Sequence, residues 1–173
     1  MSAGHLIALI GAPGAGKTTL RTWWPAATVV SLDDNRRLLS PCGCSANQDE
    51  TLCAAAVQLG FDIARPVLAA AGTVLWDATN AVAADRRALL VLAAETGATA
   101  TAVVITTPVV EALARNATRD EHMCWCGYAR RVPDAVVTQM CHDIEQAHPT
   151  LPREGWDAVL TTAGSAVSGQ VRL

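Results

Sequence analysis

Short apolar, β-branched runs alternate along the chain with segments whose apolar residues recur at helical spacing. The runs predict strands, which we place at residues 7–10, 28–32, 73–77, 99–106 and 156–160. The segments between them predict helices, at residues 17–24, 33–39, 49–71, 83–96, 109–117 and 133–148. Strands that alternate with helices predict an α/β fold, a parallel five-stranded sheet with helices on both faces.

Two of these elements have an unusual composition. Residues 99–106 are an almost unbroken β-branched run, which is typical of a strand buried on both faces. Residues 49–71 have helical spacing but include Gly60 and Pro66. We therefore expect one long helix that is disturbed at both of these positions.

The remaining sequence shows no repeat and no boundary between domains. We expect a single domain over residues 1–173, because this length is enough for one hydrophobic core. Residues 118–132 are polar, rich in Arg and Cys and without periodicity, and we expect an Arg-rich lid there. Residues from about 163 to 173 are expected to form a flexible tail. Hydrophobic residues make up 51% of the chain and charged residues 17%, which excludes a disordered composition.

Charge and hydropathy limit the possible partners. The net charge of −3 gives no general attraction to nucleic acid, so anion binding depends on local arginine clusters. No uninterrupted apolar run is long enough to span a bilayer, and the N-terminus enters the first strand without a basic leader. We therefore expect no membrane association and a cytoplasmic location.

The first predicted strand leads into a glycine-rich loop, residues 11–18, with the sequence GAPGAGKT. It matches G-x-x-x-x-G-K-[ST], the P-loop, whose backbone N–H groups surround a polyphosphate. Lys17 is the only lysine of the chain and is expected to reach the β- and γ-phosphates, while Thr18 binds Mg²⁺. We expect ATP and Mg²⁺ here, bound through Gly11, Ala12, Pro13, Gly14, Ala15, Gly16, Lys17, Thr18 and Thr19.

Acidic residues follow two further strands, and the carboxyl ends of parallel strands meet at one edge. Asp33 is our candidate for the general base of a phosphoryl transfer. Arg36 comes three residues later, so on a helix the pair could hold an acceptor with a hydroxyl and a nearby phosphate. A capping role for Asp33 or Asp34 with a solvated Arg36 explains the spacing equally well. Asp77 either orients the water shell of Mg²⁺ or forms a turn.

Arginines cluster toward the end of the sheet pattern. Arg115 and Arg119 are spaced i, i+4, so both are expected to point from one helix face toward the triphosphate. Arg130 and Arg131 lie in the expected lid, which could close over the phosphates and exclude water. A solvated basic loop is the alternative for these two residues.

Six cysteines are present, and four of them form two C-x-C pairs, Cys42 with Cys44 and Cys124 with Cys126. This spacing is closer than that of the common C-x-x-C zinc knuckle. In a cytosolic protein we expect plain thiols. A shared four-thiolate zinc site and a disulfide between the pairs are the alternatives.

Four sequence blocks occur in a characteristic order. They are GAPGAGKT (11–18), SLDDNR (31–36), WDATN ending in DRR (76–87), and ARNATR (114–119) followed by RRVPDAV (130–136). Together they resemble the 5′-kinase domain of the polynucleotide kinase family, as in phage polynucleotide kinase and the kinase module of bacterial RNA end-repair enzymes. The resemblance runs from about residue 5 to about residue 162 and implies a P-loop kinase fold.

The resemblance also implies a role for each matching residue. Lys17 and Thr18 serve the ATP phosphates and Mg²⁺. Asp33 is the general base, and Arg36 grips the phosphate on the 3′ side of the acceptor nucleotide. The implied lid arginines on the ATP phosphates are Arg115 and Arg119, with Arg119 catalytic.

The block that follows the third predicted strand adds acceptor contacts, which we assign to Asp77, Thr79 and Asn80. Between Arg119 and Arg131 the chain departs from the family, because this segment is longer and richer in cysteine than an ordinary lid.

The expected function is an ATP-dependent polynucleotide 5′-hydroxyl kinase that acts on RNA or DNA ends. Relatives often carry a phosphatase or ligase module, so separate phosphatase or ligase proteins are expected partners. One alternative is a P-loop kinase for a small molecule such as an antibiotic, nucleoside or sugar, which the acidic net charge favours. A second alternative is a non-catalytic nucleotide-binding regulator.

Overall fold

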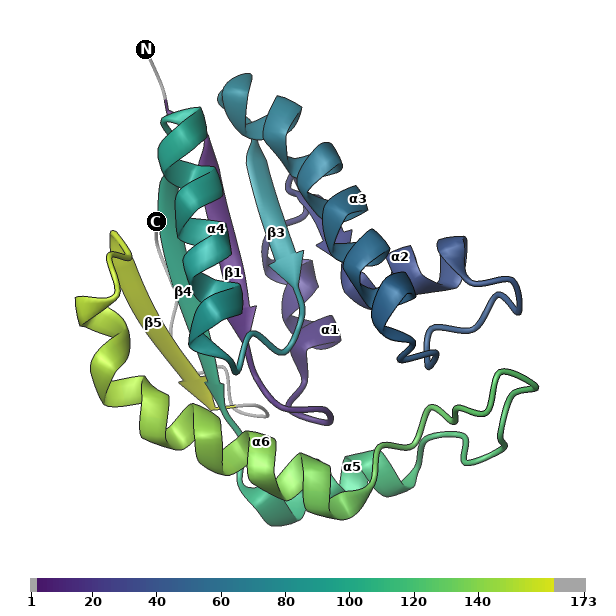
Figure 1. Cartoon of the computed structure of the whole chain (residues 1–173). Coiled ribbons are helices and arrows are strands. Elements are labelled where there is room, and N and C mark those ends of the chain that lie inside the picture. The colour runs from purple at the N-terminus through teal and green to yellow at the C-terminus, as the bar shows by residue number, and fades with distance from the viewer. Residues whose placement is uncertain (1–2, 164–173) are drawn as a thin grey trace.

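The structure is a computed structural model, and it describes residues 3–163 of the chain. Its five strands form one parallel sheet with the order β2-β3-β1-β4-β5 (Figure 1). The strands are β1 (His5–Ile10), β2 (Thr28–Ser31), β3 (Thr73–Asp77), β4 (Thr99–Thr106) and β5 (Ala158–Ala163). The predicted parallel five-stranded sheet is therefore confirmed.

The helices also follow the predicted alternation. They are α1 (Lys17–Leu20), α2 (Leu32–Leu39), α3 (Glu50–Ala69), α4 (Ala83–Thr96), α5 (Val109–Ala117) and α6 (Asp134–Ala147), with the 3₁₀ helices η1 (Arg21–Trp23) and η2 (His148–Arg153). The predicted strand at 156–160 begins later, at Ala158, and reaches Ala163. The rest of the predicted tail lies outside the described residues.

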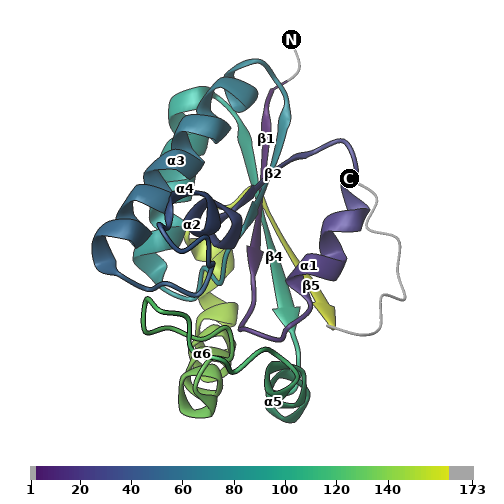
Figure 2. The ribbon, with the colours of Figure 1, turned by 90° about the vertical axis from the view of Figure 1, so that its right-hand side faces the viewer.

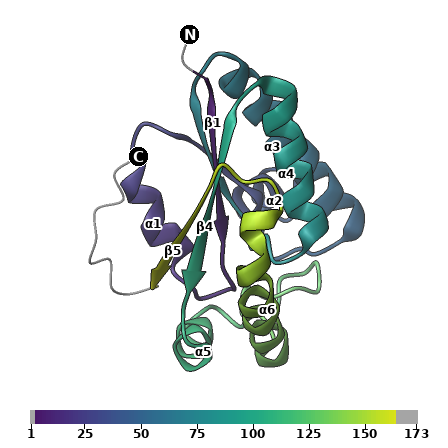
Figure 3. The ribbon, with the colours of Figure 1, turned by 90° about the vertical axis from the view of Figure 1, so that its left-hand side faces the viewer.

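The helices cover the two faces of the sheet unequally, and the direction of the crossovers explains why. From β1 the chain crosses the sheet toward β2, whereas every later connection runs in the opposite direction. Because such crossovers are right-handed, opposite directions place helices on opposite faces. Figures 2 and 3 show α1 on one face, α3 and α4 on the other, and α5 beyond the carboxyl ends of the strands. The prediction of helices on both faces is confirmed.

The central strand β1 is buried on both sides, as its continuous apolar sequence indicates. Leu6, Ala8 and Ile10 belong to the larger core cluster, which includes residues of α3, α4 and α6. The alternate residues Ile7 and Leu9 pack in a smaller cluster with Trp24 beside it. Successive side chains of a strand point to opposite faces, so one strand supplies both cores.

Helix α3 is one long helix, as predicted, and it continues through Gly60 and Pro66. A Cβ atom at Gly60 would lie 2.7 Å from the ring of Trp76, so the glycine allows α3 to approach β3 closely. This packing outweighs the roughly 1 kcal/mol by which glycine weakens a helix interior. Pro66 lies in the last turn, where few further helical hydrogen bonds depend on it.

By length and composition, α3 is also the one helix among residues 3–163 that could cross a membrane. A core helix of a soluble protein passes the same test, so this is weak evidence for a membrane span. Here α3 turns four buried residues, Ala56, Gly60, Ala64 and Leu68, to the core.

A buried ion pair joins α4 to the segment before β5. Arg86 is 2% exposed, and its Nε and Nη2 atoms donate to the two carboxylate oxygens of Glu154 at 2.8 and 2.6 Å. Its Nη1 donates to the carbonyls of Asn80 and Ala81 at 3.1 and 2.6 Å. The side-chain nitrogen and oxygen atoms of the pair all have hydrogen-bond partners. The bonds to Asn80 and Ala81 hold the segment that follows β3 against α4.

Removing one partner of this buried pair should be far more costly than removing an exposed pair. We expect Glu154→Ala to lower the free energy of unfolding by about 3 kcal/mol, because it leaves the Arg86 charge buried. The matched control is Glu95→Ala, which removes the exposed Arg65–Glu95 pair of 2.7 Å and should cost about 1 kcal/mol or less. Urea denaturation at neutral pH measures both, and equal costs would contradict this account.

The same pair predicts a pH dependence of stability. The hydrogen bond from Arg86 is the main cause that lowers the pKa of Glu154. A lowered folded-state pKa means that the stabilisation is complete above the unfolded pKa of about 4.3 and is lost as the pH falls through the folded pKa. The difference in unfolding free energy between wild type and Glu154→Ala should therefore shrink below about pH 4.

Candidate active site

The P-loop leaves β1 at the centre of the carboxyl edge and enters α1 at Lys17. Gly14 and Gly16 have φ values of 83° and 98°, which glycine adopts without strain. A Cβ atom at Gly14 would also collide with the carbonyl oxygen of Ala112 in α5. Within residues 3–163, the backbone N–H groups of Gly14, Gly16 and Thr18 donate to no backbone carbonyl. These groups can therefore bind an anion.

Two segments that follow neighbouring strands hold the P-loop in this shape. The N–H of Gly11 donates to the carbonyl of Thr79 at 3.1 Å, after β3. The hydroxyl of Thr107 donates to the carbonyl of Ala15 at 2.9 Å, after β4. The loop is thus fixed from both sides of β1.

Asn80, which we predicted in the acceptor site, lies beneath the loop. It is 3% exposed with φ 48°, and its side-chain amide donates to the carbonyl of Leu9 at 2.7 Å. Thr79 contributes its backbone to the bond with Gly11. The structure therefore places both residues against β1 and the P-loop, where they support the loop.

Lys17 folds back over the P-loop. Its Nζ donates to the carbonyls of Gly11 and Ala12 at 2.7 and 2.9 Å. Burial lowers the pKa of Lys17 to about 8, and the negative charges of Asp77 and Asp33 oppose this shift. The lysine is therefore close enough to both carboxylates for their charges to act on it.

Asp77 has a partner that the sequence did not reveal. Arg21, in η1, donates from Nε to Oδ2 of Asp77 at 2.6 Å, and the Asp77 side chain is only 6% exposed. Thr18 is exposed beside the same edge. Hydroxyl and carboxylate oxygens are ligands that Mg²⁺ accepts, directly or through water. These two residues fit a Mg²⁺ site, with one oxygen of Asp77 bound to Arg21.

Asp33 and Arg36 were predicted either to hold an acceptor together or to be a helix cap and a solvated arginine, and the structure distinguishes these alternatives. Ser31 is the N-cap of α2, and its hydroxyl accepts from the N–H of Asp34 at 3.3 Å, so the alternative of a cap by Asp33 or Asp34 is wrong. Arg36 is not solvated, because its side chain is 14% exposed and its Nε donates to the carbonyl of Ser45 at 3.1 Å. Its Nη2 donates to Asp33, which is 60% exposed. The pair combines a held guanidinium with an accessible carboxylate.

Arg115 contributes to the P-loop from α5. Its Nη1 donates to the carbonyl of Gly14 at 3.2 Å, and its Nη2 pairs with Glu111. Helix α5 ends at Ala117, two residues before Arg119. The prediction that Arg115 and Arg119 share a helix face is therefore wrong, because the helix stops between them.

Arg119 nevertheless lies within the site. Burial lowers its pKa, the charge of Asp33 opposes this shift, and Arg130 adds to it. Arg119 in turn lowers the pKa of Lys17. Asp33, Lys17 and Arg119, which come from three different segments, thus lie close enough for their charges to interact, and Arg130 lies near Arg119.

Asn116, which we did not predict, joins the two ends of the irregular segment 118–132, the predicted lid. It is 0% exposed; its amide donates to the carbonyl of Val132 at 2.6 Å and its oxygen accepts from the same residue's N–H at 3.2 Å. Arg131 donates from its N–H to the carbonyl of Asp120 at 3.0 Å and pairs with Glu121 at 3.0 Å. Arg131 therefore binds to the lid itself.

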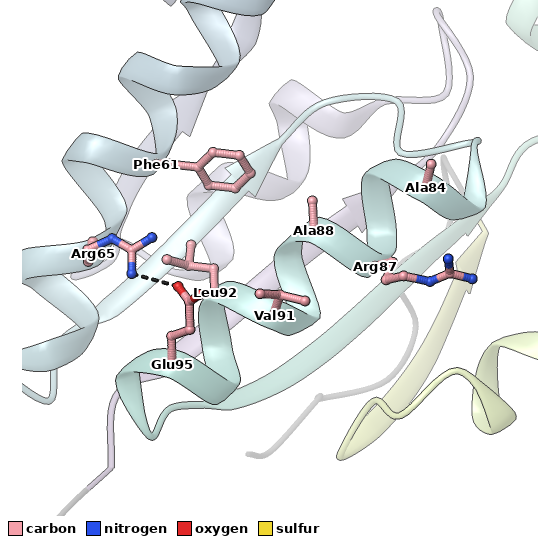
Figure 4. Close-up of a pocket in the computed structure, with 8 residues that line it drawn as sticks. All are labelled: Phe61, Arg65, Ala84, Arg87, Ala88, Val91, Leu92 and Glu95. Carbon is pink, nitrogen blue, oxygen red and sulfur yellow. Dashed lines mark hydrogen bonds and ion pairs between the residues drawn. The ribbon is translucent and has the colours of Figure 1, made fainter.

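A pocket of about 410 Å³ opens elsewhere, between α3 and α4 (Figure 4). Phe61 and Val91 line it, and Arg65 and Glu95 form an ion pair at its edge. None of the residues that we predicted for ATP, Mg²⁺ or acceptor binding lines this pocket. The candidate active site is therefore the polar carboxyl edge of the sheet.

A parallel sheet with a P-loop after its central strand and charged side chains around it defines a kinase-like P-loop protein. The chain belongs to the AAA domain family AAA_33, whose sequence model matches residues 6–147. No curated protein sequence matches the chain significantly.

Similar solved structures share this fold. A chain of the Pnkp1/Rnl/Hen1 RNA repair complex is 19% identical with a TM-score of 0.73, over 87% of this chain and 47% of that one. Kti12 of Chaetomium thermophilum in complex with ADP-AlF3 is 19% identical with a TM-score of 0.59, over 91% of this chain and 88% of that one. APS kinase CysC of Mycobacterium tuberculosis with AMPPNP and APS is also 19% identical, with a TM-score of 0.53, over 68% of this chain and 71% of that one. The protein thus spans about half the length of the RNA repair chain, and at these identities the likeness shows a shared fold.

The lowered pKa of Lys17 predicts that nucleotide binding weakens in alkali. Triphosphate binds the protonated lysine, so affinity is lost as the pH rises through about 8. We expect the Kd of a fluorescent ATP analogue to rise roughly tenfold between about pH 7 and about pH 9. Lys17→Met should bind weakly at both pH values with a ratio near one. A wild-type Kd that does not change with pH would refute the assignment.

Proposed function

We propose that the protein is an ATP-dependent kinase that phosphorylates 5′-hydroxyl ends of RNA or DNA. The kinase-like P-loop fold supports phosphoryl transfer, and one observation supports this acceptor in particular. An accessible carboxylate, Asp33, is paired with a held arginine, Arg36, within electrostatic reach of the P-loop lysine. A carboxylate next to a cation suits an acceptor that presents a hydroxyl near a phosphate.

In the proposed reaction, the oxygen of the 5′-hydroxyl attacks the γ-phosphorus of ATP, and Asp33 accepts the proton of that hydroxyl. A new O–P bond forms, the bond to the β,γ-bridging oxygen breaks, and ADP leaves. Lys17 and Arg119 stabilise the negative charge that moves onto the phosphoryl oxygens and ADP. A Mg²⁺ ion held by Thr18, with Asp77 acting through water, would neutralise further phosphate charge.

Arg36 gives the acceptor side its selectivity in this proposal. Its Nε is fixed by the carbonyl of Ser45, while its Nη2 is paired with Asp33. A phosphate on the 3′ side of the acceptor nucleotide would bind the guanidinium in place of Asp33. The carboxylate would then be free to accept a proton, which links acceptor binding to activation of the base.

The proposed setting is the cytoplasm, with nucleic-acid ends as substrates. The likeness to a chain of an RNA repair complex supports nucleic-acid ends as substrates, and we propose separate phosphatase or ligase proteins as partners. A small-molecule kinase is the second candidate, and the net charge of −3 favours it because nucleic acid is not attracted overall. A non-catalytic regulator is less well supported, since it would not need the exposed carboxylate of Asp33.

A matched pair of variants tests the base. We expect Asp33→Asn to lower transfer from γ-labelled ATP to a 5′-hydroxyl oligonucleotide by about 10² to 10⁴-fold. Asp34→Asn is the control, because Asp34 lies in the same turn but forms only exposed pairs, with Arg37 at 2.9 Å and with Arg21 at 3.5 Å, and it should change the rate about twofold. Both variants should bind ATP about as tightly as wild type.

Three outcomes would count against the proposal. A near wild-type rate for Asp33→Asn would reject the base assignment. Equal losses in both variants would point to a general effect on the first turn of α2. Transfer to a small alcohol without transfer to RNA or DNA would favour the small-molecule kinase.

A further inference from the structure

Four cysteines from distant parts of the sequence meet at one point. Cys42 and Cys44 lie in the segment between α2 and α3, and Cys124 and Cys126 lie in the lid. Their four sulfur atoms are all within 4.8 Å of one another, and each residue is half-buried. The Sγ atoms of Cys44 and Cys126 are 3.4 Å apart.

The local backbone brings the two sulfur atoms of each pair to the same place. Gly43 and Gly127 have φ values of 67° and 84°, so each C-x-C pair lies in a reversal of the chain. The N–H of Gly43 donates to the carbonyl of Ser40 at 2.9 Å, and that of Gly127 to the carbonyl of Cys124 at 2.8 Å. Each pair therefore sits on a turn, and the two turns face each other.

The spacing of the sulfur atoms fits a tetrahedral metal site. With a Zn–S bond of about 2.3 Å, the sulfur atoms of a four-thiolate zinc centre are about 3.8 Å apart. The 3.4 Å between Cys44 and Cys126 is close to that value and well beyond the length of about 2.05 Å of a disulfide bond. Thiolates are soft ligands that select zinc over the hard cations Mg²⁺ and Ca²⁺.

We propose that Cys42, Cys44, Cys124 and Cys126 bind one structural Zn²⁺ ion that joins the lid to the segment after α2. Four thiolates close the coordination sphere, so the ion has no open position for catalysis. Binding releases the protons of those cysteines that are thiols in the free protein, and the ion is neither oxidised nor reduced. The structure brings together the two pairs, which we expected from the sequence to be plain thiols, and the zinc site is our proposal for them.

The proposed zinc ion would join the lid to the segment that follows α2. The segment that carries Cys42 and Cys44 continues to Ser45, whose carbonyl holds Arg36. The lid that carries the other two ligands begins beside Arg119 and is closed at its base by Asn116. The ion therefore connects the two sides of the candidate site and limits how far the lid can open. This consequence rests on the proposed function, whereas the zinc site does not.

Metal analysis tests the site directly. Protein purified without chelator from zinc-supplemented cells should contain about one zinc ion per chain, which a mercurial reagent releases. Cys44→Ser and Cys126→Ser should each retain less than about a tenth of it. Cys53→Ser is the matched control and should retain the full amount, since Cys53 lies outside the cluster.

The release of zinc by the mercurial reagent is measured on the wild-type protein. The test therefore remains valid even if a serine variant does not fold. Less than about 0.1 zinc per chain after refolding with Zn²⁺ would overturn the proposal. Iron in place of zinc, or a disulfide between the pairs detected by thiol counting, would overturn it as well. A failed kinase assay would leave the zinc result unchanged, so the two proposals fail separately.

Limited proteolysis tests the link between the ion and the lid. Trypsin cleaves after arginine, and the lid region contains Arg119, Arg130 and Arg131. Removal of zinc should speed cleavage there by about tenfold or more, because the free lid opens more often. Cys53→Ser should be cleaved at the wild-type rate. An unchanged rate in zinc-free protein would show that the ion does not restrain the lid.

Discussion

The site depends on the hydrogen bonds that hold the backbone of the P-loop. The segments after β3 and β4 bond to Gly11 and Ala15, and Arg115 of α5 bonds to Gly14. These contacts leave the N–H groups of Gly14 and Gly16 free of backbone partners within the described chain. A loop that is held through the N–H of Gly11 and the carbonyls of Gly14 and Ala15 can present its other N–H groups to an anion without reorganisation on binding, which is the basis of electrostatic preorganisation.

The parallel sheet explains why the remaining groups meet at this loop. Asp77 ends β3, and Asp33 and Thr107 come shortly after β2 and β4, so the carboxyl edge brings them together with the end of β1. The lid then adds Arg119 and Arg130 from beyond α5. The residues that we propose for ATP and for the acceptor thus come from separate segments. A link between the lid and the segment after α2 would hold these segments at a fixed position relative to each other.

Much of the fold could be predicted because its signals are local. The apolar runs identified the strands, and the motif at 11–18 identified the P-loop. Features that depend on tertiary structure could be predicted less well. Gly60 does not break α3, because the glycine fits against Trp76 of β3. The end of α5 at Ala117 likewise separates two arginines that the sequence spacing had placed on one face.

Parts of the site lay beyond sequence reasoning for the same reason. Arg21 and Asp77 are 56 residues apart, and no local pattern indicates that they pair. Arg86 looks like a surface helix residue until Glu154 is found beside it. The C-x-C pairs were visible, but their convergence requires the lid and the segment after α2 to be neighbours in space.

The most direct measurement compares a nucleoside 3′-monophosphate with the plain nucleoside as acceptors of γ-labelled phosphate, in wild type and in Arg36→Ala. If the Asp33–Arg36 pair recognises a hydroxyl next to a phosphate, wild type should prefer the 3′-monophosphate by about 10²-fold or more in kcat/KM. The preference should fall to within about threefold in Arg36→Ala. Equal use of both acceptors by the wild-type protein would contradict the account.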